Sequence, residues 1–264
     1  LRLLSVCPGC DRPSRLPQAR PLRGTGPPLR RSVAMRKTLA IFGANGATGR
    51  HAVKQAVARG HSVRAIEKAW PEGADLPEGV EARTADVTSD DLAPHIEGCD
   101  AVISCIGVPL DAGTALSPPP LYTDGTRSYI DAMGRTGVRR IVVISATFVE
   151  TLDRGPLLFR AAAAVALQPI FTQMGEMERL LRASDTDWTA VRPGWLMTGD
   201  KTCDYTVTPD VIAEGLIRTR HGDLAHFMLD CADGDDWIRR TPAIARREAS
   251  EYESGHALAA EVAP

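Results

Sequence analysis

The amino-acid sequence predicts an α/β protein with a doubly wound, mainly parallel sheet and helices on both faces. Strand and helix patterns alternate from residue 38 onward, which is the order that parallel strands with helical crossovers require. Residues 101–107 and 140–145 are continuous apolar runs, typical of strands that are buried on both faces. A glycine-rich turn stands between the first strand pattern and the first helix pattern. We find no internal repeat and no second-domain boundary, so a single domain is expected.

The elements follow from periodicity and from the residues that end each pattern. The first strand is expected over residues 38–43, and the Ala/Val face of residues 47–59 predicts a helix that Gly60 ends. Residues 109–120 contain four prolines and predict a loop. The other elements are expected as strands at 62–67, 81–85, 101–107, 140–145 and 188–193, helices at 89–97 and 124–136, and a helical region at 157–184.

Residues 1–35 differ from the rest of the chain. They contain seven Arg and one Asp, a formal charge of +6, so that residues 36–264 carry −8 of the total −2. Six prolines and no hydrophobic periodicity predict a disordered extension. A transit peptide and an over-long gene start both remain open, because Met35 directly precedes the first strand. No aromatic residue accompanies the arginines, so a nucleic-acid-binding arm is not expected. The folded domain is expected over 36–246, and the polar, Ala-rich residues 247–264 as a tail.

Composition excludes several classes of protein. No apolar run approaches the ~18 residues that span a bilayer, so no membrane partner is expected. Cys7 and Cys10 form one Cys-x-x-Cys pair, whereas a structural zinc site needs a second pair or spaced histidines. Cys105, within an apolar strand, is interpreted as a small core residue. The chain is therefore expected to be a reduced, cytoplasmic protein without a metal, and a monomer is possible.

The turn at residues 43–49 has the spacing of a dinucleotide-binding motif. Gly43 allows the tight turn, Gly46 lets the backbone approach a pyrophosphate, and Gly49 lets the helix pack against the strand. The start of the following helix offers N–H groups and a partial positive charge to phosphates. The cofactor-binding residues predicted here are Gly43, Asn45, Gly46, Ala47, Thr48, Gly49 and Arg50.

Ligands of doubly wound sheets bind at the carboxyl ends of the strands. The predicted contacts from the later strand ends are Lys68, Asp86, Val87, Gly107 and Pro193. The second strand ends in Glu67 and Lys68, an acid that would favour NAD and a base that would favour the 2′-phosphate of NADP. Arg50 could supply a second cation. We expect NADP(H).

From about residue 37 to residue 240 the chain resembles the atypical short-chain dehydrogenases of the NAD(P)-binding, NmrA-like group. Within that group the likeness is strongest to the flavin reductase that is also called biliverdin-IXβ reductase. The segments that carry the resemblance are 41–49, 124–127 with 130–133, 145–146, 187–194, 205–208 and 223–229.

The resemblance implies a seven-stranded Rossmann-like sheet and NADPH as the hydride donor. Ser145 stands at the place of a serine that lies near the nicotinamide in the flavin reductase. Trp195 stands where that enzyme has a histidine over its substrate, a departure that argues against bilin reduction. A tryptophan there could stack on a flat aromatic substrate instead. The predicted catalytic residues are therefore Ser145 and Trp195.

The chain lacks the Tyr-x-x-x-Lys pair with which ordinary short-chain dehydrogenases protonate a substrate oxygen. The tyrosines at 122, 129, 205 and 252 are followed four residues later by Thr126, Met133, Pro209 and His256. Either the substrate needs no protein acid, or the protein does not turn its cofactor over. A flavin fits the first case, because orienting two stacked rings would suffice.

We expect an NADPH-dependent reductase of a small, flat acceptor, a flavin or a quinone-like compound, with FMN or FAD as substrate rather than prosthetic group. The alternative is a non-catalytic, NAD(P)-sensing regulator of the NmrA type. A relative of the sugar-nucleotide epimerases is a third interpretation, but those enzymes normally keep the Tyr/Lys pair.

Three other patterns are interpreted as structural. Glu178 and Arg182, four residues apart, predict a surface ion pair. His221 and His226 are expected on the surface. Residues 174, 177, 180 and 181 form an apolar helical stripe that is typical of a core.

Overall fold

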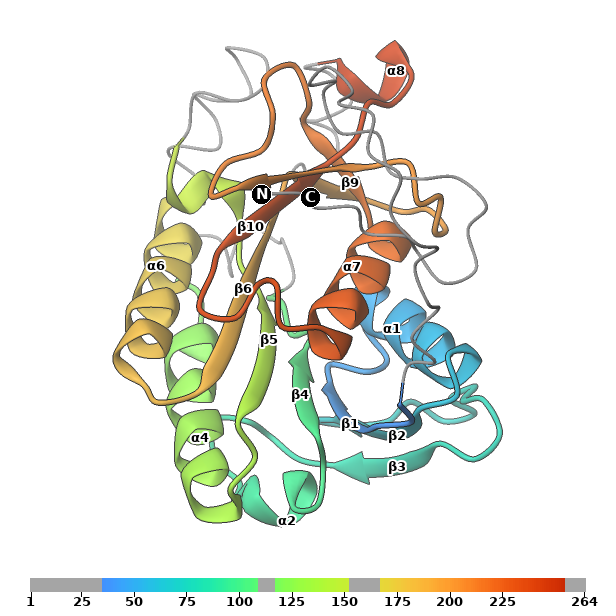
Figure 1. Ribbon diagram of the computed structural model, residues 1–264, viewed down its shortest axis with the longest axis vertical. Coiled ribbons are helices and arrows are strands. Elements are labelled where there is room, and N and C mark those ends of the chain that lie inside the picture. The colour runs from blue at the N-terminus through green and yellow to red at the C-terminus, as the bar shows by residue number, and fades with distance from the viewer. Residues whose placement is uncertain (1–34, 109–116, 152–166, 255–264) are drawn as a thin grey trace, which may run out of the picture.

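The computed structural model describes residues 35–108, 117–151 and 167–254. Their main sheet has eight strands in the order β3-β2-β1-β4-β5-β6-β10-β8 (Figure 1). All neighbouring strands are parallel except β10 and β8. The strands are β1 Thr38–Phe42, β2 Ser62–Glu67, β3 Glu81–Thr84, β4 Ala101–Ser104, β5 Arg140–Ile144, β6 Asp187–Pro193, β8 Thr206–Pro209 and β10 Pro242–Ala245.

This arrangement confirms the predicted fold class. The order β3-β2-β1-β4-β5-β6 is the doubly wound order of dinucleotide-binding sheets, which changes direction between β1 and β4. The seven strands that the resemblance implied are one too few for this sheet. The difference arises at its far edge, where β8 pairs antiparallel with β10.

Helices cover both faces of the sheet, as Figure 1 shows. Helices α1 (Ala47–Ala58) and α7 (His221–Asp233) pack together on one face. Helices α4 (Leu121–Thr136) and α6 (Gln168–Ala183) pack together on the other, and the short α2 (Ala93–Ile96) packs beside α4. Two large apolar cores result, one under each pair of helices, and Ile212, Ala243 and Ala245 form a small third cluster.

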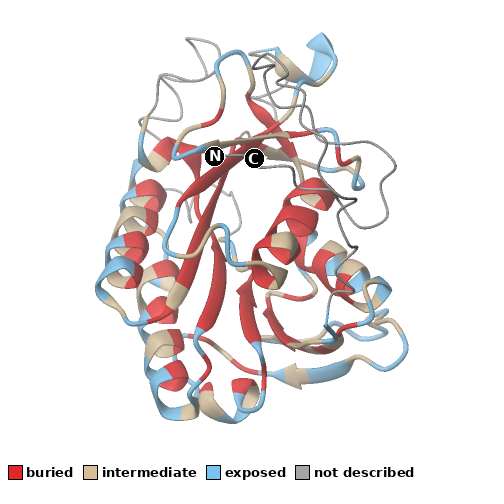
Figure 2. Cartoon of the chain, in the orientation of Figure 1, coloured by how far each residue is buried: buried red, intermediate tan, exposed pale blue. Residues whose placement is uncertain are grey.

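The first strand, β1, contributes side chains to both of the large cores. Successive side chains of a strand point to opposite faces. Ala40 and Phe42 therefore lie in the core under α4 and α6, and Leu39 and Ile41 in the core under α1 and α7. Figure 2 shows the central strands buried, whereas β3 at the edge is largely exposed.

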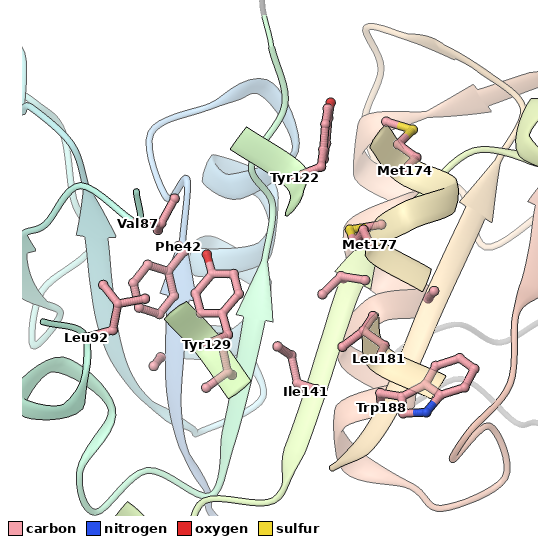
Figure 3. Packing of buried hydrophobic residues seen from close by; sticks show 14 of the residues in the cluster. Phe42, Val87, Leu92, Tyr122, Tyr129, Ile141, Met174, Met177, Leu181 and Trp188 are labelled. Atoms are coloured by element: carbon pink, nitrogen blue, oxygen red, sulfur yellow. The ribbon is translucent and has the colours of Figure 1, made fainter. Parts of the chain in front are cut away.

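The core under α4 and α6 contains three of the four residues of the apolar helical stripe that the sequence predicted, and the fourth, Leu180, is half-buried outside this core. Met174, Met177 and Leu181 are buried there, and Figure 3 shows them on α6 beside β5 and β6. Further along the same core, the rings of Phe42 and Tyr129 meet edge to face with their centroids 4.9 Å apart.

Several boundaries differ from expectation. Strand β4 ends at Ser104 instead of residue 107, and the residues that follow it line a cavity described below. Helix α4 begins at Leu121, directly after the prolines, and α2 has only four residues. The helical region expected at 157–184 is described only from residue 167, as α6. The predicted N-terminal extension and most of the predicted tail lie outside the described residues.

The last third of the chain adds short elements to this framework. Strands β7 (Trp195–Met197) and β9 (Arg218–Arg220) form a separate parallel pair. Helix α8 covers Ser250–Glu253, and the 3₁₀ turn η1, which lies earlier in the chain shortly after β5, covers Thr147–Val149. Within the described ranges, no helix is both long and apolar enough to cross a bilayer. The same ranges contain no group of three His, Cys, Asp or Glu residues placed to hold a metal ion.

Candidate functional site

A cavity of about 620 Å³ lies at the carboxyl ends of β1, β4, β5 and β6. It extends to side chains of α4, η1, α6 and β7 and to the first residue of α7. This is the edge of the sheet at which the sequence analysis expected a ligand. The predicted site residues that line it are Gly46, Ala47, Thr48, Gly107, Ser145, Pro193 and Trp195.

The three glycines of the turn have different environments. Gly43 has a φ of +68°, and a Cβ there would lie 2.9 Å from the carbonyl carbon of Cys105. A Cβ on Gly49 would lie 1.9 Å from the Gly43 carbonyl oxygen, so no side chain fits. At Gly46 a Cβ would meet only that same oxygen, at 3.2 Å. Gly43 and Gly49 thus allow close packing of the backbone, whereas Gly46 leaves room toward the cavity.

The start of α1 fits a phosphate. Gly46 is the N-cap residue, and the first N–H groups of a helix have no acceptor within it. Ala47 and Thr48 line the cavity at this point, and the first turn of α1 contains no acidic residue. Backbone donors and the positive end of the helix dipole therefore face the space that Gly46 leaves open. Arg50 is exposed on the same first turn but does not line the cavity.

The two residues at the end of β2 that bear on the choice between NAD and NADP, Glu67 and Lys68, have different surroundings. The Glu67 carboxylate accepts a hydrogen bond from the Asn45 backbone N–H at 2.7 Å, and so faces the glycine turn. Lys68 points outward with 77% of its side chain exposed, and its Nζ lies 2.8 Å from Asp86 Oδ2. This contact, together with donors from Thr88, lowers the pKa of Asp86 to about 2. Lys68 and Asp86 therefore form an ion pair beside the turn.

Val87 contributes differently from the neighbouring Asp86. Its side chain is buried in the core, and a Cβ on Gly125 of α4 would lie 3.1 Å from it. The Val87 side chain is therefore part of the core and does not line the cavity.

Ser145, at the end of β5, belongs to a buried polar network. Its hydroxyl donates to Glu178 Oε1 at 2.7 Å. Arg192 of β6 binds both oxygens of the same carboxylate, at 2.9 and 2.7 Å, and Arg182 binds Oε2 at 2.9 Å. The predicted ion pair between Glu178 and Arg182 is present, but the prediction that it lies on the surface was wrong, because Glu178 has no exposed surface. The carboxylate is buried because a second arginine, from β6, balances its charge.

Aromatic side chains form the wall of the cavity away from the glycine turn. Trp195 is buried at the start of β7, and its ring lies 6.3 Å from that of Phe148, at 65°. The Phe148 and Phe171 rings lie 5.6 Å apart. Tyr122 of α4 adds its hydroxyl, which accepts a hydrogen bond from the Val108 N–H at 3.3 Å. Burial raises the pKa of Tyr122 above its ordinary value, so this residue stays protonated.

The sequence analysis did not predict three polar residues of the cavity, Tyr122, Thr198 and His221. His221 lines the cavity at the start of α7, and its Nδ1 lies 2.8 Å from Thr48 Oγ1. The short strand β9 directly precedes His221, but its three residues carry no recognisable pattern. His226, also expected on the surface, is fully buried, with its Nδ1 2.7 Å from the Tyr205 hydroxyl.

Comparison with known proteins places the chain in a family. Residues 43–235 match the family described as NAD(P)H-binding. The chain belongs to this family. The match begins at the first glycine of the turn, directly after β1, and includes β4, β5, β6 and β7 and the helices α1, α4, α6 and α7. It confirms the expected NAD(P)-binding group, and it agrees with the fit of the turn to a phosphate.

Relatives of similar length have broad or unassigned functions. The chain is 29% identical over 189 residues to an uncharacterised chloroplastic protein of Arabidopsis thaliana, covering 69% of this chain and 67% of that protein. It is 27% identical over 177 residues to an uncharacterised sugar epimerase of Bacillus subtilis, covering 65% of this chain and 78% of the relative.

Solved structures share the fold. A provisionally named NADH–flavin reductase of Streptococcus pneumoniae aligns with a TM-score of 0.63 at 22% identity, over 80% of this chain and all of that one. A short-chain dehydrogenase/reductase of Veillonella parvula, in complex with NADP, aligns with a TM-score of 0.63 at 17% identity, over 83% and 99% of the two chains.

Proposed function

We propose that this protein is an NADPH-dependent reductase that delivers hydride to a flat, redox-active acceptor such as a flavin or a quinone. One observation carries the proposal. A single cavity joins the start of α1, whose backbone donors suit a phosphate, to a wall of aromatic rings, Phe148, Phe171 and Trp195. The bound dinucleotide would supply a hydride from its nicotinamide. The aromatic wall would hold the acceptor ring within the same cavity, so that catalysis consists mainly of proximity and orientation.

The polar residues of the cavity support an acceptor that needs no protein acid. The chain lacks the Tyr-x-x-x-Lys pair, and Ser145 directs its proton to Glu178. Burial raises the pKa of Tyr122 above its ordinary value, which makes its hydroxyl a weaker proton donor than an ordinary tyrosine. A flavin or a quinone can take its proton from solvent after hydride transfer, so that Ser145 and Trp195 would position rings. The name of the Streptococcus pneumoniae neighbour fits this chemistry.

The choice of NADPH rests on the end of β2. Lys68 is the exposed cation at this strand end, where dinucleotide-binding folds meet the ribose. Glu67, the competing acid, is hydrogen-bonded to the glycine turn. The Veillonella parvula neighbour, with the same fold, binds NADP.

The absence of the Tyr/Lys pair also favours a second candidate, an NAD(P)-sensing regulator that binds the cofactor without turning it over. Two measurements on the purified protein separate the candidates. NADPH binding is followed by titration, and NADPH oxidation is followed by absorbance with flavins, quinones and bilins as acceptors. The reductase predicts both binding and oxidation. Binding with no oxidation by any acceptor would support the regulator and overturn the reductase.

A further inference from the structure

We infer that the acceptor end of the cavity selects uncharged ring systems, so that a neutral acceptor is used in preference to an anionic one with the same ring. This inference rests on the proposed reductase function. Among the described residues that line the cavity, none is Asp, Glu, Lys or Arg. The wall formed by η1, α6 and the start of β7 consists of apolar and aromatic side chains, among them Phe148, Phe171, Met174 and Trp195.

The charges behind this wall are already balanced. The buried carboxylate of Glu178 lies behind Ser145, which lines the cavity and donates a hydrogen bond to it. Arg192 and Arg182 both contact Glu178, and Arg192 also lies 3.1 Å from Glu150, so two arginines face two carboxylates. An anionic group in the acceptor half would therefore lose its hydration without meeting a counter-charge from the described walls. Burying an isolated ion in such surroundings is costly.

The two ends of the cavity thus differ in the ligands that they suit. Gly46, Ala47 and Thr48 present backbone donors and the positive end of α1, which suit the phosphates of a dinucleotide. His221 contacts Thr48 and therefore also belongs to this end. The aromatic end offers stacking area without charge, which suits a neutral ring.

Riboflavin and FMN form a matched pair for the test, because they share the isoalloxazine ring and differ by one phosphate. A second pair is 1,4-naphthoquinone and its 2-sulfonate. With saturating NADPH, we expect kcat/KM for the neutral member of each pair to be higher by about tenfold or more, mainly through a lower KM. Equal or better use of the charged members would overturn the inference while leaving the reductase function intact.

A binding measurement tests the inference even without turnover. Flavin fluorescence is titrated against the protein saturated with NADP⁺, using riboflavin and FMN in parallel. We expect tighter binding of riboflavin, and equal or tighter binding of FMN would overturn the inference. If riboflavin binds more tightly but no acceptor oxidises NADPH, the selectivity stands and the proposed reaction fails.

A substitution at the cavity wall should reverse the selectivity. Met197, the last residue of β7, lines the cavity and is partly exposed, so that a longer polar side chain can be accommodated. We expect Met197→Lys to shift the FMN-to-riboflavin ratio of affinities toward FMN by about tenfold, by adding a cation. Met197→Gln, which is polar but uncharged, should leave the ratio at the parent value. An unchanged ratio in Met197→Lys would mean that charge is not what the cavity distinguishes.

Discussion

Gly46 is the residue whose missing side chain keeps the cavity open at the start of α1. We predict that Gly46→Val abolishes NADPH binding but leaves the protein folded, since the new Cβ meets only the Gly43 carbonyl oxygen, at 3.2 Å. Gly49→Val is the contrasting variant. Its Cβ would lie 1.9 Å from the same oxygen, so the turn itself should fail. Cofactor titration and thermal unfolding measure the two effects, and undiminished NADPH affinity in Gly46→Val would remove this turn from the cofactor site.

Lys68 and Glu67 determine the preference between the two nicotinamide cofactors in our proposal. Lys68→Ala should weaken NADPH binding by about tenfold or more and NADH binding much less, because only NADPH offers a phosphate for a charge-assisted contact. Glu67→Gln should strengthen NADPH binding, because it removes a negative charge while the amide oxygen can still accept from Asn45. Dissociation constants for both cofactors test both variants. A loss in Lys68→Ala that is equal for NADPH and NADH would contradict the role given to this lysine.

At the scale of elements, α6 is joined to β5 and β6 through one buried carboxylate. Glu178→Gln leaves Arg192, with 2% of its side chain exposed, without its main counter-charge. We predict a loss of about 3–5 kcal/mol in the free energy of unfolding, as for other buried pairs that lose one partner. Ser145→Ala removes a single hydrogen bond to the same carboxylate and should cost about 1.5–3 kcal/mol. Denaturant unfolding measures both, and similar small losses would show that the charge of Glu178 is not required.

The same network shows what the sequence could and could not predict. A helical pattern reveals neighbours on one helix, so Arg182 was recognised as the partner of Glu178. Arg192 lies on β6, and no periodicity connects it with α6. The strands β1, β4 and β5 were predictable because both of their faces are buried, which makes their sequences continuously apolar. Strands β7 and β9 have only three residues each, too few to show a pattern.

At the scale of the whole molecule, a layer of titratable groups joins the two helices that cover one face of the sheet. Arg59, directly after α1, contacts both Asp230 and Asp233 of α7, at 2.8 and 3.0 Å. His226 Nδ1 lies 3.4 Å from Asp230 Oδ2. The sequence placed His226 on the surface because the residues that enclose it, such as Tyr205, come from other parts of the chain.

Burial acts in opposite directions on two members of this layer. It lowers the pKa of His226 from 6.5 to about 3, and the positive charges of Arg59 and Lys201 contribute to this shift. Between pH 3 and pH 6.5 the unfolded chain therefore binds one proton more at His226 than the folded protein does. Stability from His226 therefore falls as the pH falls below 6.5. Burial raises the pKa of Asp230 from 3.8 to about 6, so here the folded protein binds the extra proton. The stabilising contribution of Asp230 falls as the pH rises toward 6. Between about pH 4 and pH 6 the contributions of His226 and Asp230 to the free energy of unfolding therefore change in opposite directions.

Removing one of the two groups should expose the effect of the other. We predict that Asp230→Asn makes the free energy of unfolding fall more steeply than in the parent as the pH drops from 6 to 4, by up to about 1.4 kcal/mol for each pH unit. His226→Asn should change the slope in the opposite direction, because only the Asp230 contribution then remains. Each variant loses some stability at every pH, so the slope relative to the parent is the relevant quantity. Denaturant unfolding at several pH values measures it, and parallel curves for parent and variants would show that these two groups do not titrate as their burial requires.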